Sequence, residues 1–215
     1  VSDVTRPIPY ADFLEVVLEE IELAGVPGNA ITVLIATGMH RPSTPAEREH
    51  MFGVNVCERY RIIDHHADKA EELVTITGKS RAGRAIQLNR AFVEADFHVI
   101  TGLVEPHFMA GYSGGRKVVA PGVAYQDTIL MFHRARILEH CKAANCIIEG
   151  NPLHNEQIER REGVMLAEFE PPWLGPRIVQ PALLLHEHEH GWGYAFMTGE
   201  MSGPETRPPS LIRQA

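Results

Sequence analysis

Cysteine is scarce in this sequence, and long hydrophobic runs and an excess of basic residues are both lacking. Three cysteines, Cys57, Cys141 and Cys146, occur in 215 residues, so they cannot all pair and the composition is not that of a disulfide-stapled secreted domain. This cysteine usage predicts a cytoplasmic protein. No apolar run approaches the roughly 18 to 20 residues of a membrane-spanning helix, and no basic-then-apolar signal segment opens the sequence, so we expect no membrane partner.

The charge balance argues against a nucleic-acid partner. The 20 Lys and Arg residues are outnumbered by 28 Asp and Glu, which gives a formal net charge of -8 that would repel a phosphate backbone. With 44% hydrophobic and 22% charged residues the composition is that of an ordinary globular protein, which excludes disorder, collagen and a coiled coil. The unusual count is 12 His, a residue that serves as an acid/base group near neutral pH and as a metal ligand.

Both ends of the sequence have the character of cut ends. The chain begins at Val1 rather than at a Met, and from Pro171 onward it becomes rich in Pro and Gly, which is typical of loops and frayed tails. We therefore expect a piece of a longer protein, with one α/β domain over residues 1–170 and an edge segment with an irregular tail over residues 171–215.

Alternating helices and strands are expected along the first domain. Apolar residues recur at helical spacing from Tyr10 to Ala24, Ile31–Ala36 is a short β-branched run typical of a buried parallel strand, and Thr44 begins a capping box for a helix that ends near Phe52. Further strands are expected over 60–63, 73–77 and 97–101, further helices over 90–94 and 127–140, and an extended segment over 118–122. This order predicts a layered α/β fold with a mostly parallel sheet flanked by helices, in which ligands gather beyond the carboxyl ends of the strands.

The first candidate site follows the strand Ile31–Ala36. The segment Thr37–Pro42 places His40 and Arg41 directly after that buried strand, where ligand-binding loops of such folds lie. A solvated histidine in a connection is the alternative interpretation of His40.

The second candidate is the segment Glu105–Lys117. Its glycines allow the backbone to approach a ligand closely, and Lys117 offers an amine for covalent chemistry, but the residues around this lysine do not form a P-loop. Gly111–Gly115 has the form G-x-S-x-G, which would make Ser113 the nucleophile of a serine hydrolase. Against that hypothesis, a helix should follow such a turn immediately, and we expect extended chain over 118–122.

Other histidines are weaker candidates when judged from the residues alone. His133 lies within the expected helix 127–140, where a histidine packed against the core is the simpler interpretation. The alternation from His186 to His190 would place three imidazoles on one face of a strand, and His65 and His66 follow Asp64, so zinc sites are conceivable at both.

Taken together, several segments resemble the amino-terminal domain of the nickel-dependent lactate racemase family. They occur in the family's order and near its spacing, and cover the chain well from Val1 to about Ile158. The matching segments are Ser2–Pro7, Ala36–Thr44, Glu105–Gly122, Thr128–Ile129 with His133, and Gly150–Asn155.

The resemblance implies a racemase or epimerase of a 2-hydroxy acid, with lactate as the first guess, that uses a nickel pincer nucleotide as its cofactor. In the family a lysine tethers the cofactor and a histidine ligates its nickel, and the corresponding residues are Lys117 and His133. Soft sulfur donors with one imidazole suit square-planar Ni(II). Two family histidines that act as acid and base correspond to His40 and His107, and a near-neutral pKa would suit each of them to this exchange.

The resemblance also implies the surroundings of these groups. Arg6 would hold the carboxylate of the substrate or an anionic group of the cofactor, while Asp3, Ser113, Gly114 and Gly115 would contact the cofactor. The family's carboxy-terminal domain, absent from this sequence, contributes a further lysine and glutamine, and cofactor-biosynthesis proteins are expected partners. A serine hydrolase that uses Ser113, or an inactive fragment that binds a nucleotide or a metal, are the alternatives.

Overall fold

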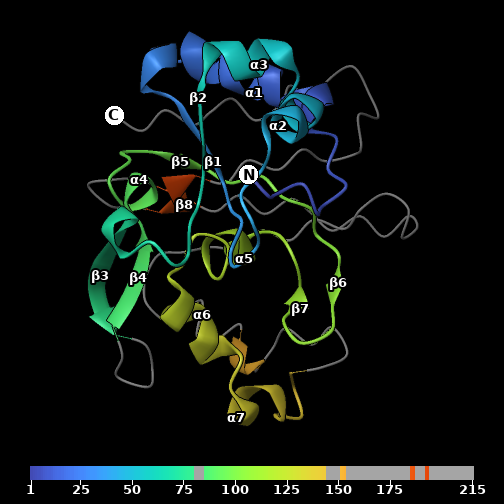
Figure 1. Ribbon diagram of the computed structural model, residues 1–215, viewed down its shortest axis with the longest axis vertical. Helices are drawn as coiled ribbons and strands as arrows, with labels where there is room; N and C mark the ends of the chain where they lie inside the picture. The colour runs from blue at the N-terminus through green and yellow to red at the C-terminus, as the bar shows by residue number, and fades with distance from the viewer. Residues whose placement is uncertain (80–84, 144–150, 154–184, 187–191, 194–215) are drawn as a thin grey trace.

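The computed structural model describes residues 1–79, 85–143, 151–153, 185–186 and 192–193. Helices and strands are interspersed along the chain (Figure 1). In chain order the elements are α1 (Tyr10–Leu23), the 3-10 helix η1 (Gly28–Ala30), β1 (Thr32–Ile35), α2 (Pro45–Phe52), α3 (Val54–Arg59), β2 (Arg61–Asp64), the 3-10 helix η2 (Ala70–Glu72), β3 (Leu73–Lys79), β4 (Ala85–Asn89), α4 (Arg90–Val93), β5 (His98–Val99), β6 (Pro106–His107), β7 (Gly111–Tyr112), α5 (Arg116–Val119), α6 (Gln126–Phe132), α7 (Ala135–Leu138), β8 (Leu185–His186) and β9 (Trp192–Gly193).

Parallel pairing organises the first third of the chain. β1 pairs with β2 in parallel, with Thr32 opposite Arg61 and Ile35 opposite Asp64, and an isolated parallel bridge joins Ser2 to Ala36 just beyond β1. α1, α2 and α3 lie together at one end of this pair (Figure 1). The chain's first residues therefore run beside β1 and reach the loop that follows it, which carries His40.

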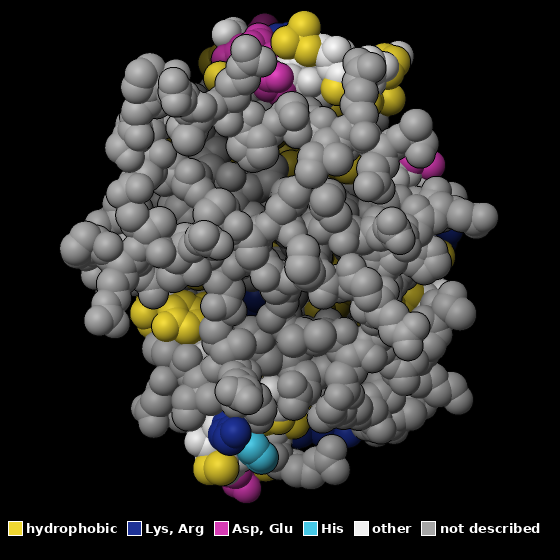
Figure 2. All heavy atoms as spheres, turned by 180° about the vertical axis from the view of Figure 1, so that it is seen from behind, with side chains coloured by type: hydrophobic (Ala, Val, Ile, Leu, Met, Phe, Trp, Pro, Cys, Tyr) yellow, Lys and Arg dark blue, Asp and Glu magenta, His cyan; other side chains and the backbone are white. Residues whose placement is uncertain are grey.

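The core beneath these helices follows from the hydrophobic pattern of α1. Tyr10, Leu14 and Leu18 face inward and are almost completely buried, together with Val33 and Ile35 of β1. Each such aliphatic side chain contributes about 1.5–3 kcal/mol when it leaves water. The opposite side of α1 carries acidic residues, and acidic and hydrophobic side chains gather on the surface at the end of the molecule formed by α1 to α3 (Figure 2).

The capping box predicted at Thr44 is present. The Thr44 hydroxyl accepts a hydrogen bond from the Glu47 amide at 3.2 Å, and the Glu47 carboxylate accepts one from the Thr44 amide at 2.8 Å. Such reciprocal bonds satisfy two backbone donors that a helix start leaves free. They fix the start of α2, and with it the direction in which the preceding loop leaves β1.

The remaining described strands are both parallel and antiparallel. β5 pairs with β9 in parallel, whereas β3 with β4, β6 with β7, and β8 with β9 are antiparallel. Helices and strands are interspersed along the chain and parallel pairing occurs in two places, so the α/β class is confirmed. In the part of the chain that the structure describes, no helix is both long and apolar enough to span a membrane.

The helix expected over 127–140 is wrong in its length, because the chain leaves the helix at His133. α6 ends at Phe132, His133 has φ -99° and ψ 20°, and Arg134 is extended before α7 begins. The break has a packing reason. Phe132 and Ile137 are buried in the same small cluster, and side chains five residues apart on one continuous helix would point to different faces.

The extended segment expected over 118–122 is also wrong. Val118 and Val119 lie in α5, which follows the turn at Gly114 and Gly115. β-branched residues favour strands, but Val118 is buried in a cluster with Ala124 and Ile129, and that tertiary packing overrides local propensity.

The carboxy-terminal predictions fall almost entirely outside the described residues. His186 lies in β8, which pairs with β9, while the rest of the alternating stretch to His190 and most of the segment 171–215 are not described.

Candidate active site

A cavity of about 350 Å³ lies among the loop after β1, the β6–β7 hairpin, α5 and the end of α6. It brings together the four side chains to which the resemblance assigns chemistry: His40, His107, Lys117 and His133. Of the other residues proposed from sequence, Asp3, Arg6, Ser113 and Gly114 line the cavity, whereas Gly115 is not among its lining residues. Segments separated by more than 90 residues thus meet at one site.

His40 is held by a buried carboxylate. Its Nδ1 lies 2.5 Å from Oδ2 of Asp3, whose side chain is only 7% exposed while that of His40 is 55% exposed. The other carboxylate oxygen, Oδ1, accepts hydrogen bonds from the Thr5 hydroxyl at 2.6 Å and the Thr5 amide at 3.2 Å. Asp3 is therefore fixed by its own turn and orients the imidazole ring across a gap of 37 residues.

His107 is held by backbone amides instead. Its Nδ1 accepts hydrogen bonds from the amides of Ala110 at 3.2 Å and Met109 at 3.4 Å, and its ring stacks on Phe108 with centroids 4.8 Å apart. Burial, followed by the charges of Lys117, Arg6 and His133, lowers the pKa of His107 to about 4. This value lies below the near-neutral pKa that an acid/base role for His107 leads one to expect.

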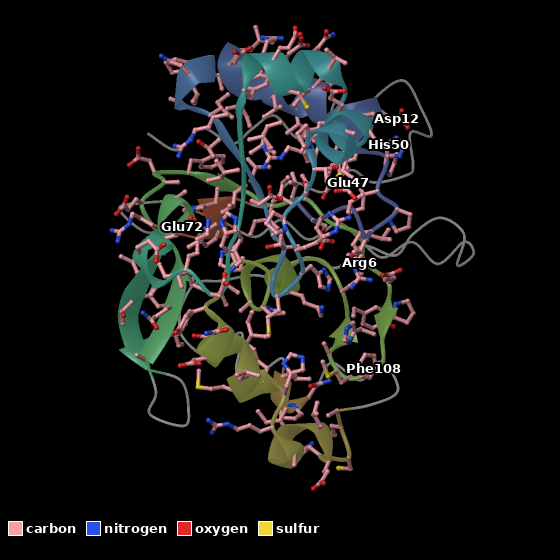
Figure 3. All side chains as sticks on the ribbon, viewed as in Figure 1. Arg6, Asp12, Glu47, His50, Glu72 and Phe108 are labelled. Atoms are coloured by element: carbon pink, nitrogen blue, oxygen red, sulfur yellow. The ribbon has the colours of Figure 1, made fainter. Side chains whose placement is uncertain are left out.

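Arg6 and Glu105 form an ion pair at the edge of the cavity. Nη1 of Arg6 donates to Oε1 of Glu105 at 2.7 Å, and both side chains are about one-third exposed. Figure 3 shows Arg6 near one end of the β6–β7 hairpin and the exposed Phe108 near the other. Because one Nη group is used by Glu105, the remaining guanidinium donors are the ones available to an anion.

The Ser113 hydroxyl is committed to the backbone. It donates to the Leu103 carbonyl at 2.7 Å and accepts from the Glu105 amide at 3.1 Å, and the residue is 7% exposed. A helix does follow this turn, as the hydrolase hypothesis requires, but the hydroxyl holds the loop that carries Glu105. Ser113 therefore has a structural role in the site, because its hydroxyl joins two parts of the backbone.

Gly114 allows the loop to pack closely. Its φ is +71°, and a Cβ there would lie 2.9 Å from both the Leu103 carbonyl oxygen and Cγ2 of Val104. Gly115 has φ +46°, but a Cβ added there would meet no atom within 4 Å. Both residues adopt a positive φ, which favours glycine. Only at Gly114 would a side chain also collide with neighbouring atoms.

Lys117 projects its amine toward the cavity from α5. Burial, and then the positive charge of Arg6, lowers the pKa of Lys117, while the carboxylates of Asp3 and Glu105 oppose that shift. A lowered pKa leaves more of the amine uncharged and nucleophilic near neutral pH. Its environment thus suits covalent attachment.

His133 has the arrangement expected of a metal-binding imidazole. Its Nδ1–H donates to the Ile129 carbonyl at 2.9 Å, which leaves the lone pair on Nε2 for a ligand. Among the described residues, no group of three or more His, Cys, Asp or Glu side chains could hold a metal ion.

His65 is a buried structural histidine. Nε2 lies 2.9 Å from the Ala124 carbonyl and Nδ1 lies 3.2 Å from Nδ2 of Asn89, so both nitrogens are satisfied, and burial lowers the pKa of the ring. Neighbouring His66 pairs with Glu72 at 2.9 Å.

Two residues that shape the site were missed in the sequence. Glu105 was only part of a motif, and no local pattern indicates that it pairs with Arg6. Asn151 is fully buried and donates to the Met109 carbonyl at 3.0 Å, which supports the turn after His107. The resemblance to the family over Gly150–Asn155 was the only feature of the sequence that pointed to Asn151.

Comparisons with known proteins agree on one family. The family model of the lactate racemase N-terminal domain matches residues 1–145. Lactate racemase of Thermoanaerobacterium thermosaccharolyticum is 36% identical over 77% of this chain and 38% of its own, and that of Lactiplantibacillus plantarum is 32% identical over 77% and 39%.

Solved structures agree with this result. The lactate racemase apoprotein from T. thermosaccharolyticum superposes with a TM-score of 0.70 at 37% identity, over 74% of this chain and 37% of the other. A Thermotoga maritima protein shares the fold with a TM-score of 0.59 at 23% identity. The chain spans less than two-fifths of the length of these curated lactate racemases. Over most of its described length, the chain belongs to the family of lactate racemase N-terminal domains.

Proposed function

We propose that this chain is the cofactor-anchoring domain of a racemase or epimerase that acts on a 2-hydroxy acid, with lactate as the first substrate to test. The observation that carries the proposal is the shared cavity, which is lined by His40, His107, Lys117 and His133. Two imidazoles for proton transfer, an amine for attachment and an imidazole for a metal are the groups that this chemistry needs.

The residues present fit a nickel pincer nucleotide. Lys117 has the lowered pKa that favours covalent attachment, and the hydrogen bond of His133 to Ile129 leaves Nε2 free to ligate nickel. The sulfur donors of the pincer group complete a ligand set that Ni(II) prefers. When bound, the nucleotide would supply an electrophilic ring suited to reversible hydride transfer at the substrate's α-carbon.

The chain's own residues would handle the substrate's proton and charge. One imidazole removes the hydroxyl proton, and the other lies ready to protonate the oxygen when the opposite enantiomer forms. Arg6, with donors left beyond its contact to Glu105, would bind the carboxylate. The activity is proposed for the longer protein, in which a second domain of the family would complete substrate binding. A cytoplasmic location stays a prediction from cysteine usage.

The test is attachment of the cofactor. The chain is expressed with the cofactor-making proteins, and intact mass and nickel content are measured for the wild type, Lys117→Ala and the exposed-lysine control Lys142→Ala. We expect an adduct and nickel in the wild type and in Lys142→Ala, and loss of the adduct in Lys117→Ala. Unmodified, nickel-free wild-type protein contradicts the proposal.

The serine hydrolase alternative makes the opposite prediction. A fluorophosphonate probe labels an activated serine, but the Ser113 hydroxyl is engaged by the Leu103 carbonyl and the Glu105 amide. We expect no labelling that Ser113→Ala removes. Labelling lost in that variant would favour the hydrolase.

A further inference from the structure

The two imidazoles proposed for acid/base work have different partners at the same ring atom. Nδ1 of His40 faces a carboxylate oxygen, whereas Nδ1 of His107 faces two backbone amides. A carboxylate can only accept a hydrogen bond and an amide N–H can only donate one. The partners therefore dictate where the single proton of each neutral ring resides.

At His40 the partner requires a proton on Nδ1. Oδ2 of Asp3 accepts at 2.5 Å, so Nδ1 carries the hydrogen and Nε2 keeps its lone pair. The carboxylate cannot easily turn away, because Oδ1 is held by two donors from Thr5 and the Asp3 side chain is buried. His40 thus presents a base to the cavity.

At His107 the partners require the reverse. The amides of Met109 and Ala110 both donate to Nδ1, so the proton of the neutral ring resides on Nε2. The turn that carries these amides is held by Asn151, whose amide donates to the Met109 carbonyl at 3.0 Å. A proton on Nδ1 would face two N–H groups, so His107 presents a hydrogen-bond donor.

We infer that the structure holds the two imidazoles in opposite tautomers, with His40 preset as the base, His107 preset as the donor, and Asp3 as the positioning residue that determines the tautomer of His40. The catalytic meaning of this inference rests on the proposed function. In the first step the O–H bond of the substrate breaks, its electrons stay on the oxygen, and the proton forms a bond with Nε2 of His40. The resulting imidazolium is paired with Asp3, while Nε2–H of His107 donates a hydrogen bond to a substrate oxygen.

In this resting state the protein is ready to remove the hydroxyl proton from one substrate enantiomer but not from the other. The enantiomer whose hydroxyl reaches His40 meets an unprotonated Nε2. The other enantiomer requires the proton of His107 to move from Nε2 to Nδ1, where two backbone N–H groups oppose it. We expect the proton positions to be detectable in the chain by itself, without substrate or cofactor.

The direct test is the tautomer of each ring in the purified chain. Long-range ¹H–¹⁵N NMR spectra of ¹⁵N-histidine protein, recorded at a pH of about 8, above the ordinary imidazole pKa, distinguish protonated from unprotonated ring nitrogens. His40→Gln and His107→Gln assign the signals. We expect an unprotonated Nε2 for His40 and an unprotonated Nδ1 for His107. The same tautomer at both rings, or the opposite one at either, overturns the inference.

Asp3→Asn tests the positioning role. Because Thr5 holds Oδ1, the substituted amide should place its NH₂ group where Oδ2 was, facing His40. The ring must then accept at Nδ1 and carry its proton on Nε2, the exchange of tautomer that disables an Asp-to-Asn variant of a serine protease triad. We expect the Nε2 signal of His40 to move from the unprotonated to the protonated range, with His107 unchanged.

Asp12→Asn is the matched control, since it makes the same chemical change at an exposed position on α1. An unchanged His40 tautomer in folded Asp3→Asn contradicts the role of Asp3. If Asp3→Asn does not fold, the wild-type spectra still decide the main inference. Failure of the proposed function is distinguishable, because a missing Lys117 adduct leaves the tautomers as measured.

Discussion

Replacing Gly114 with Ala tests whether close packing of the site loop stabilises this fold. Two costs are expected. The positive φ of +71° costs an L-residue about 1–2 kcal/mol, and the new Cβ, 2.9 Å from the Leu103 carbonyl oxygen and from Val104, forces a shift that costs about 1–3 kcal/mol more. The expected loss in the free energy of unfolding is therefore roughly 2–5 kcal/mol.

Gly115→Ala is the matched comparison, because it shares the left-handed backbone without the contact. Its φ is +46° and no atom lies within 4 Å of the added Cβ, so only the backbone cost of about 1–2 kcal/mol applies. The gain from a less flexible unfolded chain, about 0.4–1 kcal/mol, is common to both variants and cancels in the comparison.

The measurement is urea unfolding followed by circular dichroism, with the dependence on urea checked to be the same in all proteins. We expect Gly114→Ala to unfold at clearly lower urea than Gly115→Ala, and its Tm to be lower by about 2–4 °C for each kcal/mol of the difference. Equal midpoints would refute the reasoning, since they would mean that the loop yields to the new methyl group without cost.

Two further predictions concern stability. Arg48→Ala leaves the buried Asp64 carboxylate without its ion-pair partner and should lower the free energy of unfolding by about 3–5 kcal/mol. Arg59→Ala breaks more exposed ion pairs and should have a much smaller effect, so similar urea midpoints for the two variants would contradict this prediction. Burial lowers the pKa of His65, so below a pH of about 6.5 the unfolded chain binds more protons and stability falls as the pH drops. His65→Gln should flatten part of the fall in Tm between about pH 7 and pH 5, and an unchanged slope would show that His65 is not its source.

Local sequence signals predicted the helices and strands that depend on local interactions. α1 follows from the spacing of residues such as Leu14 and Leu18, and α2 from the bonds of Thr44 with Glu47, three positions away. β1 also lies within its predicted range. In each case the determining contacts are close in the chain, so periodicity and capping are sufficient evidence.

The errors occurred where distant packing decides the backbone. Val118 favours a strand by its side chain but lies in a helix because its neighbours in the core are Ala124 and Ile129. The helix over 127–140 breaks at His133 because Phe132 and Ile137 pack into one cluster. No residue pattern within either segment contains that information.

The sequence by itself determined which chemical groups the protein has and the order in which they occur: four groups suited to a site, spread from His40 to His133, in the arrangement of one family. Only the tertiary structure decided which hydrogen-bond partners these groups have, and therefore their protonation and orientation. Asp3 meets His40 across 37 residues and Arg6 meets Glu105 across 99, and hydrogen-bond partners of this kind place the protons and charges. The physical reason is that a side chain's tautomer and pKa depend on the donors, acceptors and charges that folding brings to it.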